Sequence, residues 1–149
     1  MIALVRIRTM APSDAEAVAQ LNGQLGYPST RDEVIRRLAA LGSPERDVLL
    51  VAEEDGRVVG WAHVGLKHSL VEVPSAQVLG LVVAEDRRSA GIGLRLLEEA
   101  EGWALAHGVH RMLVGSRVTR QRAHAFYTRH GYRVLKTSHI FEKGLGRPG

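Results

Sequence analysis

The segment Val78–Gly93 places an apolar run, a loop of small residues and the start of a helix in immediate succession. Val78–Ala84 is apolar and largely β-branched, which predicts a strand buried on both faces in the middle of a sheet. Ser89–Gly93 follows as the small-residue loop. The residues that then recur at helical spacing on one predicted face are Ile92, Leu96, Ala100, Trp103 and His107. This order predicts an α/β fold in which a central strand leads directly into a helix.

The start of that predicted helix offers a place for an anion. The first N–H groups of a helix have no partner within it, and the helix dipole is positive at that end. Small residues let an anion approach closely, and Arg87 and Arg88 add charge and forked donors. We therefore interpret the segment as a phosphate or pyrophosphate site, although a bare Gly-x-Gly such as Gly91–Gly93 more often marks only a tight turn.

Two common phosphate loops are excluded by the residues themselves. The chain has no Gly-x-x-x-x-Gly-Lys-Ser/Thr, so it is not a P-loop NTPase. It also lacks a full Gly-x-Gly-x-x-Gly, because Leu96 stands where the third glycine belongs.

Two ordered motifs stand out: Arg88–Gly93 reads Arg-x-x-Gly-x-Gly, and Ala123–Tyr127 reads A-x-x-F-Y and is followed by His130–Tyr132. They resemble the acetyl-CoA signature Arg/Gln-x-x-Gly-x-Gly/Ala and the later A-x-x-F-Y…G-F/Y segment of the GCN5-related N-acetyltransferase (GNAT) family. The resemblance extends over the chain and implies one N-acetyltransferase domain, residues 1–149. It implies an acyl-CoA N-acyltransferase-type fold: a mixed, mostly antiparallel central sheet flanked by about four helices.

The remaining elements are predicted from turns, caps and alternation. Helices are expected after the capping boxes Ser13-x-x-Glu16 and Thr30-x-x-Glu33. Asp55-Gly56 predicts a hairpin turn, and Gly80 inside a strand predicts a bulge or a close backbone approach. The other predicted strands are Leu4–Thr9, Val48–Glu53, Val58–Leu66, Arg111–Ser116, Tyr132–Lys136 and Ser138–Glu142. Thr119 is expected to cap a last helix, Arg120–His130. The first two helices are expected to overlie one edge of the sheet.

The amino-acid composition limits the classes of partner and the cellular compartment expected for this protein. Among 149 residues, Lys and Arg exceed Asp and Glu by 20 − 16 = 4, a mild excess that suits a polyanionic cofactor and is not blocked into a nucleic-acid patch. We expect no nucleic-acid partner and no membrane span. Cysteine is absent and Met1–Arg8 has no signal-peptide pattern, so a cytoplasmic protein is expected.

The resemblance implies acetyl-CoA as co-substrate. No metal is expected, because the seven histidines are scattered along the chain. The residues implied to hold its phosphates are Arg88, Ser89, Ala90, Gly91, Ile92, Gly93 and Leu94. Backbone N–H groups at Leu81, Val82 and Val83 are implied to polarise the thioester carbonyl. Arg120 stands where many members of the family carry asparagine. Two roles are expected for this arginine: contact with a phosphate of the cofactor, or an ion pair elsewhere in the protein.

Tyr127 is the candidate acid that protonates the departing thiolate. A phenol with a pKa near 10 is not ionised at neutral pH and can donate a proton. The family uses a tyrosine at this place in the A-x-x-F-Y segment. Without the resemblance, Phe126 and Tyr127 would be read as core aromatics of a helix.

The general base is left open by the sequence. The predicted central strand Val78–Ala84 contains no carboxylate, and the nearest titratable groups are Glu72, His68 and His63. Each is otherwise explained as loop surface or as a hydrogen-bonded strand histidine, and the amine can also lose its proton to bulk solvent.

The function expected is an acetyl-CoA-dependent N-acetyltransferase that acts by direct attack of a primary amine, from a small molecule or a protein, on the thioester. Tyr27 and Arg31 are candidates for contact with that acceptor. The alternative is a catalytically silent acyl-CoA-binding or regulatory domain of the same fold. A homodimer is also expected, because sheet edges need cover and family members often pair.

Overall fold

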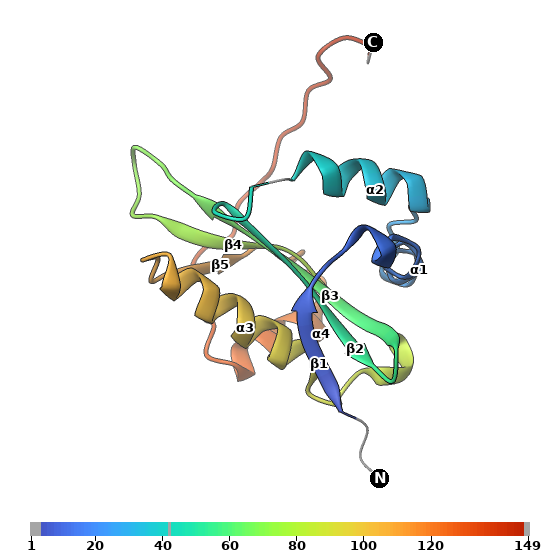
Figure 1. The fold of residues 1–149 in the computed structure, drawn as a ribbon. Coiled ribbons are helices and arrows are strands. Elements are labelled where there is room, and N and C mark those ends of the chain that lie inside the picture. The colour runs from blue at the N-terminus through green and yellow to red at the C-terminus, as the bar shows by residue number, and fades with distance from the viewer. Residues whose placement is uncertain (1–3, 42, 148–149) are drawn as a thin grey trace. The chain divides into compact units, whose positions relative to one another are not determined.

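The computed structural model describes residues 4–41 and 43–147 (Figure 1). The chain divides into two compact units, Met1–Gly115 and Ser116–Gly149. Within the described residues, the first unit contains all five strands and the helices α1 to α3, and the second contains α4.

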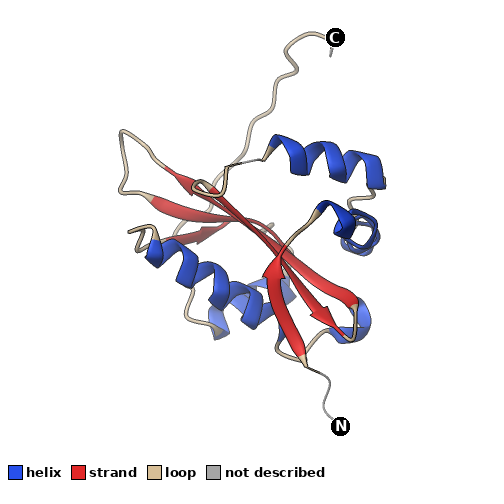
Figure 2. Ribbon diagram, viewed as in Figure 1, coloured by secondary structure: helices blue, strands red, loops and turns tan. Residues whose placement is uncertain are grey.

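The first unit is built on one mixed sheet with strand order β1-β2-β3-β4-β5 (Figure 2). The strands are β1 (Val5–Thr9), β2 (Asp47–Glu54), β3 (Arg57–Lys67), β4 (Ser75–Val83) and β5 (Met112–Val114). Neighbours from β1 to β4 are antiparallel, whereas β4 and β5 are parallel. The expectation of a mixed, mostly antiparallel sheet is confirmed.

The hairpin between β2 and β3 has its turn where the sequence predicts it. Asp55 and Gly56 both have positive φ, 51° and 78°, as a two-residue turn of the primed type requires. This turn and one register shift beside Ala52 place Asp47 opposite Gly65.

A β-bulge interrupts the pairing of β3 with β4. His63 pairs with Gly80 and Val64 pairs with Val78, so Leu79 is left over and is 59% exposed. The prediction that Val78–Ala84 is buried on both faces is therefore wrong at Leu79, whereas the bulge predicted at Gly80 is confirmed.

Helices cover both faces of the sheet in the first unit (Figure 1). On one face lies α3 (Ile92–Ala106), whose Ile92 and Leu96 are buried where Gly60 lets the helix approach β3. On the other face lies α1 (Ala15–Leu25), packed on β3 and β4 rather than over the expected sheet edge, and α2 (Arg31–Ala40) packs on α1.

Trp61 joins the sheet to the small core between α1 and α2. It packs against Ala15, Val18 and Val34, and its indole N–H donates to Oδ1 of Asn22 at 3.1 Å. Its ring also fills the space that a side chain at Gly80 would need. Glycine at this position is therefore required by packing.

The two predicted capping boxes have different outcomes. At α2, Oγ1 of Thr30 accepts from the Glu33 N–H and the Glu33 carboxylate accepts from the Thr30 N–H, as predicted. At α1, Ser13 is not the cap, because a 3₁₀ turn over Pro12–Asp14 puts it inside the turn and α1 begins at Ala15.

The second unit contains α4 (Gln121–Arg129), which ends before Gly131 at φ +90°. Thr119 does not cap it: the residue before the helix is Arg120, and no side chain caps its start. Instead, the Arg117 carbonyl accepts from the Arg120 N–H and from the His124 ring, closing a turn there.

The predicted strand pair Tyr132–Lys136 and Ser138–Glu142 is wrong within the described residues. Residues 132–147 have no regular secondary structure. The segment contains the apolar pairs Val134–Leu135 and Ile140–Phe141, but a strand also needs a pairing partner, and the described residues supply none. All four of these side chains are exposed.

Gly80→Ala should destabilise the protein by about 1–3 kcal/mol, because the new Cβ would overlap the indole of Trp61, which its bond to Asn22 holds in place. The control is Gly102→Ala in α3, where a Cβ meets nothing within 4 Å and stability should rise by up to about 1 kcal/mol. Denaturant unfolding of both variants measures the difference. Equal free energies of unfolding would contradict the packing argument.

Asp14 should make stability depend on acid. Its buried carboxylate accepts from both Nη atoms of Arg8, at 2.8 and 2.9 Å, and this bonding lowers the pKa of Asp14 below its usual value. A lowered folded-state pKa contributes stability above the unfolded value, about 4, and that stability is lost as the pH falls. Asp14→Asn should therefore be less stable than wild type at neutral pH, and the gap should narrow below about pH 4.

Urea unfolding at neutral and acid pH measures this gap. Asp32→Asn is the control, because Asp32 and its partner Arg31 are both exposed and their pair should contribute little. A gap for Asp14→Asn that is unchanged on acidification would rule out the proposed linkage.

Candidate active site

The loop between β4 and α3 has the backbone of an anion site. A short 3₁₀ helix, η2 (Glu85–Arg87), follows β4, and Gly91, with φ +82°, is the residue immediately before α3. No side chain caps α3, and the Arg95 N–H is the first to find a carbonyl within the helix, at Gly91. The N–H groups of Ile92, Gly93 and Leu94 thus remain available to a ligand at the positive end of a 15-residue helix.

Two ion pairs fasten this loop to the β2–β3 hairpin. Arg87 donates to both carboxylate oxygens of Glu54, at 2.8 and 2.6 Å, and Arg57 donates to both oxygens of Asp86, at 2.9 and 3.0 Å. The Arg87–Glu54 pair is the more buried of the two, and bidentate pairs of this kind fix geometry.

Arg87 and Arg88 therefore have different surroundings. The guanidinium of Arg87, read from sequence as a phosphate donor, is occupied by Glu54 and positions the loop. Arg88 is only partly buried and forms no hydrogen bond or ion pair within residues 4–41 and 43–147. Its guanidinium is the one of the two that remains available to an anion.

Beyond the bulge, β4 has one free edge. Its pairing with β5 covers only Ala76–Val78, so among the described strands Gly80–Val83 pairs with β3 alone. The Ala84 N–H donates to Val59 of β3, and successive N–H groups of a strand point to opposite sides. The N–H groups of Val83 and Leu81 therefore point to the free edge, whereas that of Val82 points to β3.

Tyr127 and Arg120 belong to the second unit. Tyr127 lies on α4 with its ring edge-on to Phe126 and Tyr132, at centroid distances of 5.2 and 5.5 Å. Burial raises the pKa of the Tyr127 phenol, so the group is protonated at neutral pH. Arg120 is the residue before α4 and is half-buried.

The two remaining sequence candidates lie in the loop between β3 and β4. The carboxylate of Glu72 is 3.9 Å from the guanidinium of Arg111. His68 is exposed and lines an open pocket of about 350 Å³ with Asp47, Leu79 and other residues of the sheet. The structure shows no contact between Glu72 and His68, so they do not form a pair.

The third histidine considered from sequence has a carboxylate partner. Nε2 of His63 lies 2.8 Å from Oδ1 of Asp47, and the two side chains come from adjacent strands. Sequence reasoning missed Asp47. The Asp55-Gly56 turn alone could not have found it, because counting back from the pair Glu54–Arg57 places residue 47 opposite residue 64; the register shift beside Ala52 moves Asp47 opposite Gly65, onto the face of His63.

The described residues contain no cluster of side chains suited to bind a metal ion. Within residues 4–41 and 43–147, no three His, Asp or Glu side chains are grouped so that they could hold a metal ion. Over the same residues, no helix has the length and apolarity needed to cross a membrane.

Known proteins share both the sequence pattern and the fold. The family model described as "Acetyltransferase (GNAT) family" matches residues 15–132. An aminoglycoside N(6')-acetyltransferase type 1 of Stenotrophomonas maltophilia is 31% identical over 130 residues, which cover 85% of this chain and 84% of the relative.

Solved structures show the same architecture. The aminoglycoside antibiotic 6'-N-acetyltransferase AAC(6')-Ih of Acinetobacter baumannii superposes with a TM-score of 0.84 at 20% identity, covering 96% of this chain and 100% of that one. The aminoglycoside N-acetyltransferase AAC(6')-Iy in complex with CoA superposes with a TM-score of 0.86 at 18% identity, covering 96% and 97%. The chain therefore belongs to the GCN5-related N-acetyltransferase (GNAT) family.

Proposed function

We propose that the protein transfers the acetyl group of acetyl-CoA to a primary amine, which attacks the thioester directly. The observation that carries this proposal is the free edge of β4, which leads through the loop to the uncapped start of α3. That continuous stretch offers donors for a carbonyl at one end and for phosphates at the other.

The phosphates of coenzyme A are assigned to the loop. The uncapped N–H groups at Ile92–Leu94 and the available guanidinium of Arg88 support this role. The left-handed backbone at Ser89 and Gly91 forms the turn before the helix. Arg120 is kept as a further candidate for a phosphate contact.

The thioester carbonyl is assigned to the free edge of β4. The N–H groups of Leu81 and Val83 point outward there and would stabilise the negative charge that develops on the carbonyl oxygen when the amine attacks. Val82, expected from sequence to share this role, would act through packing, because its own N–H serves β3.

The departing thiolate is assigned a proton from Tyr127. Desolvation keeps the phenol protonated, which is the state that a general acid needs. The position of Tyr127 in the A-x-x-F-Y segment of the family supports the same role.

The acceptor is proposed to be a small-molecule amine, with a protein amine as the second class to test. The names of the relative and of the two solved structures make aminoglycosides the first compounds to screen. Polyamines and peptide N-termini complete the screen, which follows release of the CoA thiol. If acetyl-CoA binds but no amine is acetylated, the protein is a silent acyl-CoA-binding domain.

The remaining expectations follow from this proposal. The family match includes residues of both compact units, which supports one N-acetyltransferase domain over residues 1–149. Acetyl-CoA is a metabolite of the cell interior, so we place the protein in the cytoplasm. A homodimer would cover a sheet edge such as β1 or β5, and sedimentation at high concentration would test for it.

Gly91→Glu should weaken acetyl-CoA binding at least tenfold, about 1.4 kcal/mol. The new carboxylate would stand at the start of α3 and repel phosphates, on a backbone at φ +82° that disfavours a side chain. Gly102→Glu, which adds the same charge to an exposed position of the same helix, should bind normally. Calorimetry on the folded variants compares them, and equal affinities would remove the loop from the site.

Tyr127→Phe should lower turnover by on the order of 10²-fold, because it removes the acidic proton and keeps the ring. Acetyl-CoA affinity should change little. Tyr132→Phe, which removes a hydroxyl from the neighbouring ring, is the matched control. Single-turnover acetyl transfer measures both variants; a wild-type rate for Tyr127→Phe would leave water as the proton donor.

A further inference from the structure

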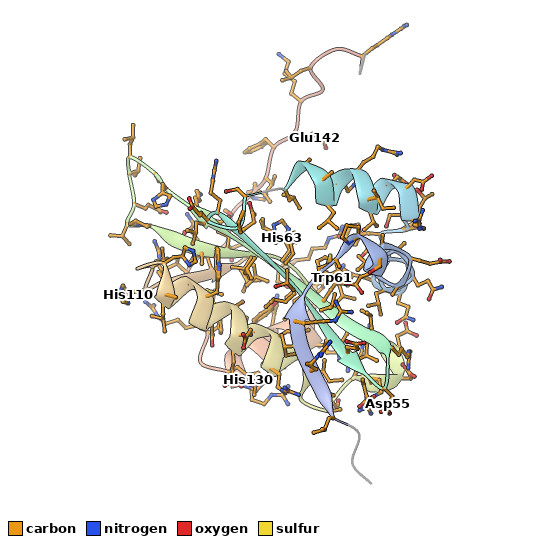
Figure 3. The ribbon with its side chains drawn as sticks, in the orientation of Figure 1. Asp55, Trp61, His63, His110, His130 and Glu142 are labelled. Carbon is orange, nitrogen blue, oxygen red and sulfur yellow. The ribbon has the colours of Figure 1, made fainter. Side chains whose placement is uncertain are left out.

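Asp47 and His63 form a pair on the sheet face that α1 and α2 cover (Figure 3 labels His63 beside Trp61). Their side chains are 20% and 14% exposed, so the pair is largely shielded from water. A carboxylate only accepts hydrogen bonds, so the 2.8 Å contact requires a proton on Nε2 of His63. In the neutral ring, Nδ1 then carries the lone pair and can accept a proton.

The Nδ1 atom of His63 is not fully buried. The structure gives it no hydrogen-bond partner within residues 4–41 and 43–147. Over the same residues, no fully buried side-chain nitrogen or oxygen lacks a partner. Nδ1 must therefore be reached by water, so one nitrogen of the ring is fixed by a carboxylate and the other is accessible.

The pair lies on the two strands before β4, across β4 from its free edge. His63 is directly opposite Gly80, the residue after the bulge from which β4 continues without β5. Leu79 and Asp47 both line the open pocket of about 350 Å³ beside it. Gly65 also belongs to this arrangement, because a Cβ there would lie 2.8 Å from Oδ1 of Asp47.

We infer that His63, oriented by Asp47, is the general base that takes the proton from the acceptor amine, directly or through one water. This inference rests on the function proposed above. The ammonium group gives one proton to Nδ1, and the free amine attacks the thioester carbonyl. The C–N bond forms and the C–S bond breaks; the nitrogen loses its second proton, the thiolate gains one, and the other leaves to solvent.

Among the titratable groups near this pair, His63 is the best placed to act as the base. From β2, His63 faces Asp47, which follows Arg46. Lys67 at the end of β3 and His68 after it line the pocket that Asp47 also lines. The strand β4 contains no titratable residue. The charged side chains of α1 and α2 are exposed, apart from Glu33, which caps α2.

His63→Gln and Asp47→Asn test the assignment, with His110→Gln as the control. His110 is exposed on the loop before β5 (Figure 3). Single-turnover acetyl transfer is measured against pH for an amine that the wild type accepts. At about pH 7, His63→Gln should be slower by roughly 10²-fold, as loss of a positioned base predicts. Asp47→Asn should be slower by about tenfold, because an amide can donate and favour the wrong ring tautomer.

The pH dependence separates a base from a structural role. The deficit of His63→Gln should shrink as the pH approaches the amine pKa, about 10 for a lysine-like amine, because solvent then supplies the free amine. Loss of packing alone would give a deficit that does not change with pH. Acetyl-CoA affinity, measured by calorimetry, should be unchanged in all three variants.

A second measurement covers the case in which His63→Gln does not fold. Added imidazole should raise the rate of His63→Ala and leave His110→Ala unchanged, since it replaces the missing base. A folded His63 variant with the wild-type rate and pH profile overturns the assignment and leaves the proposed function intact. If the wild type acetylates no amine, the proposed function fails and the assignment fails with it.

Discussion

The bulge at Leu79 is the feature on which the rest of the first unit depends. The bulge changes which N–H groups of β4 point away from β3. Before the bulge, the N–H of the even-numbered Ala76 does so and bonds to the segment of β5. After the bulge, the N–H groups of the odd-numbered Leu81 and Val83 do so. The bulge also coincides with the end of β4–β5 pairing at Val78. The extra residue in β4 thus lies where the paired edge of the strand gives way to an edge with free donors.

Side chains on the sheet face that α1 covers pack over the bulge and hold it in place. The indole of Trp61 occupies the space over Gly80, and its bond to Asn22 links that space to α1. On the opposite face, Gly60 lets α3 approach β3. The free edge of β4 is therefore held between two helix-packed layers, so its donors are oriented before any ligand binds.

Much of the fold was predictable from local chemistry. The run after Val78, the turn at Asp55-Gly56 and the capping box at Thr30 each determine their conformation through adjacent residues. The partner of His63 was not predictable in the same way, because Asp47 is 16 residues away and meets it only through strand register. The tail after Tyr132 failed as a strand prediction because apolar content alone provides no pairing partner. The same limit applies to Arg87, whose bond to Glu54 spans 33 residues.

The hairpin turn at Asp55-Gly56 has a consequence for how this chain can vary in length. Side chains alternate along a strand, so an insertion or deletion of one residue in that turn must be absorbed by a further bulge, or the register slips by one and the faces of β3 are exchanged. After such a slip, Trp61 and His63 would point toward α3, and Gly60 and Ala62 toward α1. The loop 68–74 between β3 and β4 carries no such constraint, because its exposed Leu70 and Val71 belong to no ladder. Natural or engineered insertions should therefore accumulate in that loop, whereas the two-residue turn should keep its length.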